Sequence, residues 1–383
     1  MGEMMGVGFG RGFRQAGRRQ AVQPQPQPRP VQPPAPAPLS ADQLQLSKKP
    51  APTQLRLEAD KLAAQAVGRG ATGWSCAAVC ADKVDANDQR PALCEAAAKA
   101  VAANGEAEAA ALAKLTPDQQ AAYERVACQV SADPMAHQAL QTLLTEGKLT
   151  GGTPSAEGRD LLGELDRMAE APKAAGVDGD KLLQGFVREA AHPTSVNQKN
   201  RGTCVAATMH VKGLMEQPAE MARLVTGVAS PEGTVKTAGG ATLTRAEGTA
   251  APDDTGRSES ARLLHPALMN LGGQGYSNQT DKFANGGYGV PTAGATAIAS
   301  QVFNRPVVST EGRAQLSFKA LAASANAGNS VPVATWIGNS GHEELVTGVS
   351  AAGVHVVNTQ NGTEETMPQA TFLARWRSAT YVK

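Results

Sequence analysis

The chain has 383 residues, of which 41% are hydrophobic and 19% charged, and its formal net charge is +1. This balance excludes a bulk electrostatic attraction to nucleic acid or to anionic membranes. No apolar run approaches the ~20 residues that a membrane-spanning helix needs. We therefore expect a protein with a packed core, long enough for two or three domains, with no nucleic-acid partner and no membrane span.

Residues 1–50 are predicted to be a disordered, Pro-rich arm, because QPQPQPRPVQPPAPAP cannot bury enough apolar surface to fold. A linker is the preferred role, and a binding site for a protein partner is the alternative. The N-terminus also lacks the apolar segment of a Sec signal peptide. Two destinations stay open, which are export by a specialised bacterial secretion system and the cytoplasm.

Residues 51–190 are rich in Ala, Leu, Glu, Lys and Gln, which favours helices. Thr116 followed by Pro117 predicts the start of one helix, and Gly147 the end of another. We expect a helical domain. Its position before the last part of the chain suggests a regulatory or inhibitory pro-segment.

Four of the five cysteines lie in the first half of the chain, at Cys76, Cys80, Cys94 and Cys128, and Cys204 stands alone. The four could form two disulfides, with three possible pairings, or remain buried thiols. Their spacing is poor for zinc. Disulfides and buried thiols both stay open.

From residue 191 the composition shifts toward Gly, Thr, Val and Asn. Helical patterns cover 203–216, 258–271 and 313–327, and strand patterns cover 331–338, 342–350 and 354–360. Helices followed by strands predict an α+β domain over 191–383.

Cys204 is a candidate nucleophile, because it follows NQKNRGT and begins a helical run. Thr203 as the N-cap would place the thiol in the first helical turn, where the helix dipole and free N–H groups favour a thiolate. The backbone N–H of Cys204 and the side-chain amide of Gln198 could donate to an oxyanion. The alternative is a small buried residue in a core helix.

His342 is the candidate base, because it lies at the start of a strand, directly after Gly341. His210 follows Cys204 on the same helix but is turned away from it by roughly 240°.

The register of the following hairpin decides which residue orients the imidazole. A three-residue loop at 351–353, favoured by its glycine, puts Asn358 and Gln360 on the face of His342, whereas a two-residue loop puts Asn361 there. We prefer Asn358, with Asn361 and Gln360 as alternatives.

Two segments carry a family resemblance. NQKNRGTC resembles the Gln-to-Cys segment of papain-like cysteine proteases, and GHEELVTGVSAAGVHVVNTQNG resembles a later block of their C39-like branch. The resemblance covers 191–383 and implies a papain-like domain, with a helical subdomain that carries the nucleophile and an antiparallel sheet. It implies Cys204 as nucleophile, His342 as base, Asn358 as the residue that orients the imidazole and Gln198 as oxyanion donor.

The chain also departs from the family pattern. Val205 follows Cys204 where papain has Trp, and Thr-Gln-Asn-Gly follows Asn358 where the branch has a Pro-Trp-Gly-like turn.

These residues predict a thiol hydrolase that cleaves a peptide or amide bond in a peptide or protein substrate, through a thioacyl-enzyme and without a cofactor. The same residues would serve deamidation or transamidation. A binding or effector module on an inactive protease scaffold is the alternative of another class. A zinc peptidase is excluded, because Val346 stands where an HExxH motif needs its second histidine.

Overall fold

The computed structural model describes residues 90–338 and 340–383, which belong to the larger of two compact units, Lys49–Lys383. The predicted Pro-rich arm 1–50, the first part of the predicted helical domain, and Cys76 and Cys80 lie outside the described residues.

The first described part of the chain consists of helices that begin at polar caps. Thr116 and Gln119 form a reciprocal capping box at the start of α5, with Pro117 in the first turn, as the sequence predicts. The six helices are α3 (Arg90–Ala103), α4 (Gly105–Leu112), α5 (Pro117–Val130), α6 (Pro134–Thr145), α7 (Leu161–Glu170) and α8 (Gly179–Ala191).

The remaining helices are interspersed with strands. They are η1 (Pro193–Ser195), α9 (Cys204–Glu216), α10 (Pro218–Ala229), α11 (Glu259–Gly272), α12 (Thr292–Phe303), η2 (Arg313–Gln315), α13 (Phe318–Asn326) and α14 (Gln369–Arg375). Two of the three predicted helices, 203–216 and 258–271, are confirmed as α9 and α11. The helix predicted at 313–327 is wrong at its start, because Ser317 is extended and its hydroxyl caps α13.

Six antiparallel strands form the main sheet, in the order β3-β8-β4-β5-β6-β7. The sheet comprises β3 (Val307–Glu311), β4 (Val331–Ile337), β5 (Ser340–Ser350), β6 (Gly353–Asn358), β7 (Thr363–Met367) and β8 (Trp376–Val382). The predicted strands correspond to β4, β5 and β6. A second sheet pairs β1 (Thr234–Lys236) with β2 (Thr242–Thr244). The mixture of helices and antiparallel sheet confirms the α+β class, and no helix in the described ranges has the length and apolar character to span a bilayer.

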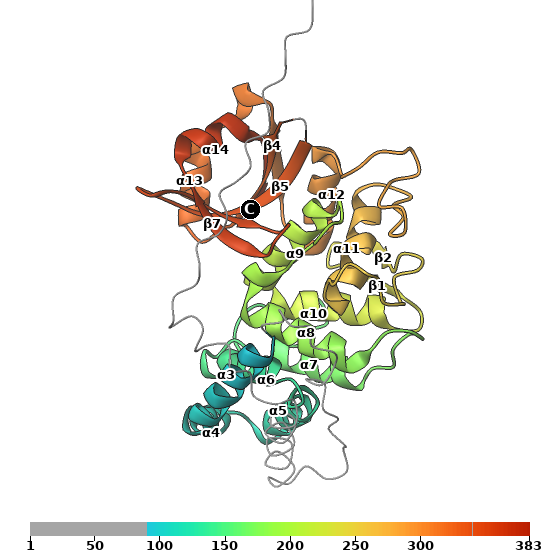
Figure 1. Ribbon diagram of the computed structural model, residues 1–383, viewed down its shortest axis with the longest axis vertical. Helices are drawn as coiled ribbons and strands as arrows, with labels where there is room; N and C mark the ends of the chain where they lie inside the picture. The colour runs from blue at the N-terminus through green and yellow to red at the C-terminus, as the bar shows by residue number, and fades with distance from the viewer. Residues whose placement is uncertain (1–89, 339) are drawn as a thin grey trace, which may run out of the picture. The chain divides into compact units, whose positions relative to one another are not determined.

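Both faces of the main sheet are buried. Leu345 and Val357 join a large core with α9 and α12, whereas Val346 and Val356 join a smaller core with α13 and α14. Figure 1 shows α13 and α14 on one side of the sheet and α9 and α12 toward the other. Side chains that alternate along β5 therefore enter two different environments.

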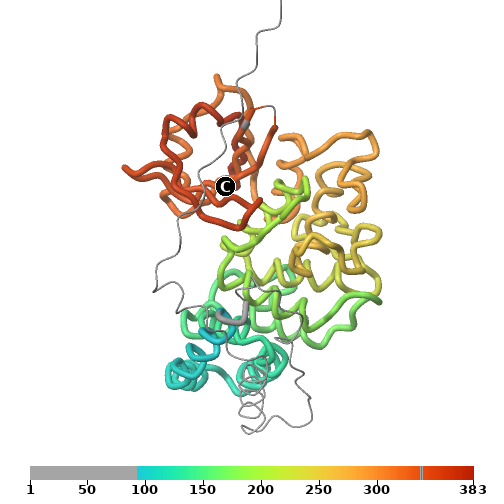
Figure 2. Tube along the Cα trace, viewed as in Figure 1, coloured from blue at the N-terminus to red at the C-terminus, as the bar shows by residue number. Residues whose placement is uncertain are grey.

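The predicted boundary at 190/191 coincides with the end of α8. Residues on both sides of that position, such as Phe186 and Met209, belong to the same buried cluster. In Figure 2 the orange segment with β3 and β4 lies against the red segment of β5, β6 and β8, as the strand pairing requires. The division into 51–190 and 191–383 stays a prediction.

The β5–β6 hairpin differs from the predicted register near its turn. Ser350 pairs with Gly353, so the loop has two residues, not three. Gly353 is required because a Cβ there would lie 2.3 Å from the Met367 carbonyl oxygen, not because of a turn. A bulge at Thr347 then shifts the register between Val346 and Gly348. The pairs differ from those of a three-residue loop, but Asn358 again lies on the same face as His342.

Candidate active site

Cys204 is the first residue of α9 and is partly exposed. Thr203 precedes it but does not cap the helix through its side chain, which corrects the expected N-cap. Its φ and ψ of −102° and 28° lie outside the extended region from which a threonine hydroxyl reaches the first-turn N–H groups. The buried Thr203 hydroxyl has no hydrogen-bond partner in the described part of the chain.

Two side chains of α9, one helical turn apart, bind the backbone of Glu343 in β5. The Thr208 hydroxyl donates to the Glu343 carbonyl oxygen at 3.2 Å, and the Glu343 N–H donates to the Cys204 sulfur. Strand β6 pairs with β5 only from Leu345 onward. Before Leu345, side chains of α9 bind the Glu343 backbone of β5 where a neighbouring strand would otherwise do so. Cys204 packs against the large core that also contains Leu345 of β5.

The surroundings of the Cys204 thiol raise its pKa. Burial raises its pKa to about 11, and the Glu343 carboxyl acts in the same direction. The N–H groups of Glu343, Val205 and Cys204 favour the thiolate but do not outweigh burial. The thiolate at the helix N-terminus stays a prediction, which the raised pKa of the thiol does not favour.

His342 and Asn358 are brought together as predicted. His342 Nε2 lies 3.0 Å from Asn358 Oδ1. The orientation of the asparagine amide is fixed twice, because Oδ1 accepts from the Gln360 N–H and Nδ2 donates to the Glu365 carboxylate. Nε2 must therefore carry a hydrogen, and in the neutral imidazole Nδ1 is the basic nitrogen.

The two alternative third members lie in the β6–β7 turn. The Asn361 side-chain oxygen accepts from the Thr363 hydroxyl, and Gln360 contributes its backbone N–H to Asn358. Neither side chain forms a hydrogen bond with His342 in the described residues. The geometry thus favours Asn358.

Cys204 and His342 are not hydrogen-bonded to each other, and they are linked only through the backbone of β5. The sulfur binds the N–H of Glu343, the residue that follows His342. Successive side chains leave a strand on opposite faces, so the imidazole and the Glu343 carboxyl leave β5 on opposite sides of the sulfur. Catalytic contacts of this kind are often long without substrate.

Gln198 is buried and held firmly ahead of Cys204. Its backbone N–H donates to the Thr359 carbonyl oxygen and its Oε1 accepts from the Thr359 hydroxyl, both at 2.8 Å. Its Nε2 donates to the Arg201 carbonyl oxygen at 2.8 Å. One of the two Nε2 hydrogens is thereby used, and the other is left for an oxyanion.

A loop that the sequence did not assign to the site holds the segment before Cys204. Both oxygens of Asp281 accept from the Gly202 N–H, at 3.0 and 2.9 Å, and the Tyr276 hydroxyl donates to the same carboxylate at 2.6 Å. Asp281 has a positive φ of 55°, which is uncommon for a residue with a side chain. No sequence signal distinguished it from other loop aspartates.

Glu343 is a second residue that the sequence analysis missed. The residue is 6% exposed, and neither of its carboxyl oxygens is among the fully buried polar atoms without a partner in the described residues. Burial, assisted by Glu344, raises its pKa to about 8. The available signal was strand alternation, because Leu345 and Glu343 occupy the same row of β5 and Leu345 is a core residue.

Two other histidines form a fully buried pair outside the candidate site. His210 Nδ1 lies 3.3 Å from His265 Nε2, and both rings are fully buried. Burial lowers the pKa of His210 to about 3, so this pair is neutral and belongs to the helical core.

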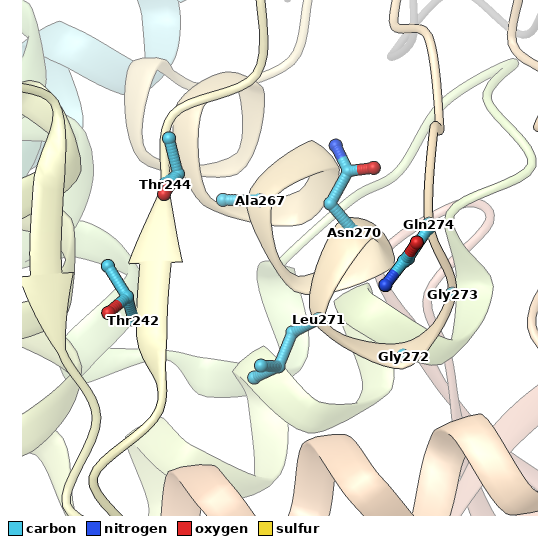
Figure 3. Close-up of a pocket in the computed structure, with 8 residues that line it drawn as sticks. All are labelled: Thr242, Thr244, Ala267, Asn270, Leu271, Gly272, Gly273 and Gln274. Carbon is cyan, nitrogen blue, oxygen red and sulfur yellow. The ribbon is translucent and has the colours of Figure 1, made fainter.

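A pocket of about 460 Å³ lies between β2 and the end of α11. Figure 3 shows two threonines from the strand facing Asn270 and Leu271 of the helix. The Asn270 side chain is already bonded to the backbone of Tyr276. No titratable side chain lines the pocket, whose residues are Thr242, Thr244, Ala267, Asn270, Leu271, Gly272, Gly273 and Gln274.

The other cysteines lie outside this arrangement. Cys94 is buried, and Cys128 is disulfide-bonded. Within residues 90–338 and 340–383, no group of three or more His, Cys, Asp or Glu side chains is placed to hold a metal ion.

Comparison of the chain with protein-family models, with curated proteins and with solved structures found no match. The papain-like relationship and its C39-like branch therefore stay a proposal.

Proposed function

We propose that the chain is a thiol hydrolase of papain-like type that cleaves a peptide or amide bond, with Cys204 as nucleophile, His342 as base and Asn358 as the residue that orients the imidazole. The single observation that carries the proposal is the 3.0 Å contact between His342 and Asn358, on the strand whose next N–H binds the Cys204 sulfur. The nucleophile would come from the start of α9, the base from the start of β5, and the residue that orients the imidazole from the end of β6.

In the proposed reaction, His342 Nδ1 accepts the Cys204 proton as the sulfur attacks the substrate carbonyl. The oxyanion receives the Cys204 N–H and the remaining Nε2 hydrogen of Gln198. The imidazolium then protonates the leaving amine, the C–N bond breaks and a thioester remains. Water attacks the thioester, His342 accepts its proton and returns it to the sulfur, and the acid product leaves.

Deamidation and transamidation share the thioester. A glutamine amide as substrate would lose ammonia, and an amine in place of water would form a new amide. The site geometry is the same for all three reactions.

A specific observation favours a second candidate of another class. The thiol pKa is raised, and the thiol and imidazole are not hydrogen-bonded. Both features suit a binding or effector module on a protease scaffold that has lost activity.

The test is incubation of the full chain and of Cys204→Ala with a complex peptide mixture, with and without an added primary amine. Mass spectrometry detects new termini for hydrolysis, a glutamine-to-glutamate mass change for deamidation, and amine adducts for transamidation. We expect new termini with the wild-type chain alone. Products that persist in Cys204→Ala, or no product from either protein, would refute the hydrolase and favour the binding module.

A further inference from the structure

Trp336 is a large aromatic side chain that the fold leaves in solvent beside the candidate active site. It lies on β4, is 46% exposed, and pairs across the β4–β5 hairpin with Gly341, the residue that precedes His342. The other tryptophan of the described residues, Trp376, is 2% exposed and belongs to the smaller core. The role inferred for Trp336 rests on the proposed function and concerns the substrate.

The indole lies on the same face of the sheet as the candidate nucleophile. Residues that pair across two strands share a face, and so do alternate residues along one strand. Trp336, Gly341 and Leu345 therefore occupy one face of the β4–β5 pair. Leu345 belongs to the large core, against which Cys204 also packs. A peptide bound over Cys204 would thus have Trp336 on its side of the sheet.

The spacing along β5 suits a contact with a nearby residue of the substrate. Thr208, one helical turn after Cys204 on α9, binds the backbone of Glu343 at 3.2 Å. Gly341, the partner of Trp336, is two residues before Glu343, which is roughly 7 Å along a strand. Since an extended peptide advances about 3.4 Å per residue, the indole would meet a side chain about two or three residues from the bond that Cys204 attacks.

The surroundings of the indole leave its surface open. Strand β8 pairs with β4 only as far as Thr335, and β6 pairs with β5 only from Leu345 onward. No third strand in the described part of the chain therefore flanks the hairpin at Trp336. Gly341 has no side chain to cover the ring, although a Cβ there would lie 3.7 Å from the indole Nε1, which is van der Waals contact. A side chain supplied by the substrate has room to make that contact.

We propose that Trp336 forms a substrate subsite that takes an aromatic or large aliphatic side chain of the peptide, about two or three residues from the scissile bond. An apolar side chain placed on an exposed indole removes apolar surface of both partners from water, and an aromatic ring gains further from edge and face contacts. Tryptophan is accordingly enriched among the residues that dominate binding of peptide and protein partners.

The experiment measures binding of two fluorescein-labelled peptides to the full chain carrying Cys204→Ala, by fluorescence anisotropy. One peptide alternates phenylalanine with serine, and in the other alanine replaces every phenylalanine. We expect the phenylalanine peptide to bind about threefold to tenfold more tightly, the range that a contact between aromatic rings provides. Adding Trp336→Ala should abolish this difference, and adding Trp336→Phe should retain it, because an aromatic face remains.

Leu373→Ala is the matched control for loss of an exposed apolar side chain. Leu373 is 39% exposed but lies on α14, which contributes to the smaller core on the other face of the sheet, so the difference between the peptides should persist. Equal affinity for both peptides would overturn the proposal, as would a difference that persists in Trp336→Ala.

If Trp336→Ala does not fold by circular dichroism, hydroxyl-radical oxidation of Trp336 in the Cys204→Ala chain decides, with the Trp336 peptide quantified by mass spectrometry. Protection by the phenylalanine peptide alone supports the subsite, and equal oxidation with both peptides overturns it. Binding needs no cleavage, so binding that depends on Trp336 without new termini from the wild-type chain would refute the hydrolase and leave the binding site intact. New termini whose flanking residues are the same in wild type and Trp336→Ala would overturn the subsite alone.

Discussion

The two side-chain rows of β5 differ in how their polar groups are satisfied. On one row His342 is hydrogen-bonded to Asn358, which in turn binds Glu365. On the other row Glu343 is buried among core residues such as Leu345. The His342 row also contains Glu344, whose buried Oε2 has no hydrogen-bond partner in the described residues, so each row carries one buried acid.

The two rows carry side chains of different chemical character, the His342 imidazole and the Glu343 carboxyl, on the strand whose backbone binds the Cys204 sulfur. Because the Cys204 sulfur binds a backbone N–H in the plane of the sheet, side chains from both rows can act on it. In the proposed site the network on the first row would orient the base, and Glu343 on the second row raises the pKa of the thiol. Substitutions on each row should therefore have distinguishable consequences.

The largest loss of activity is expected from a substitution on the row of β5 that contains His342. His342→Ala removes the proposed base and should lower the rate of peptide cleavage by about 10²- to 10⁴-fold, the usual contribution of a general acid–base group. His355→Ala is the matched control, because His355 lies on β6 but binds Ser350 and Thr366 instead. Cleavage rates on one shared peptide give the comparison, and equal losses in both variants would remove His342 from the reaction.

A smaller effect is expected from the residue that orients the imidazole. Asn358→Ala removes a hydrogen bond of about 1 to 3 kcal/mol to a ring that becomes charged, so cleavage should slow roughly 10- to 100-fold. Asn361→Ala should leave the rate near that of wild type, because Asn361 binds Thr363 in the turn. The ratio of kcat/KM values measures the difference, and a larger loss in Asn361→Ala would reverse the assignment.

Helix-capping residues and the periodicity of hydrophobic residues predicted many of the helices and strands. The cap at Thr116, the helices α9 and α11 and the strands β4, β5 and β6 all follow from capping chemistry and periodicity. Strands β3, β7 and β8 were not predicted, because short strands give weak periodic signals until they pair with distant segments. The order of the sheet depends on those pairings and could not be derived locally.

The candidate site was predicted only in part, and partly through compensating errors. Asn358 was preferred on a three-residue loop that does not exist, and the bulge at Thr347 returned Asn358 to the face of His342 in a different register. The raised pKa of the Cys204 thiol was not predicted, because it depends on burial and on Glu343, neither of which a helix-start pattern contains. Sequence patterns can predict which residues lie close together. They are less able to predict how the surroundings of those residues shift their pKa values.

The smallest effect, a loss of stability, should come from removing the hydrogen bond between Thr208 of α9 and the Glu343 backbone of β5. Thr208→Val keeps the shape of the side chain but leaves the Glu343 carbonyl oxygen without its donor, so the free energy of unfolding should fall by about 1 to 2 kcal/mol. Thr226→Val is the matched control, because the buried Thr226 hydroxyl donates to the Ala222 carbonyl oxygen four residues earlier in the same helix. That helical carbonyl keeps a backbone partner, so its loss should be smaller. Urea denaturation of both variants tests this difference, and equal losses would mean that α9 does not complete the edge of β5 through Thr208.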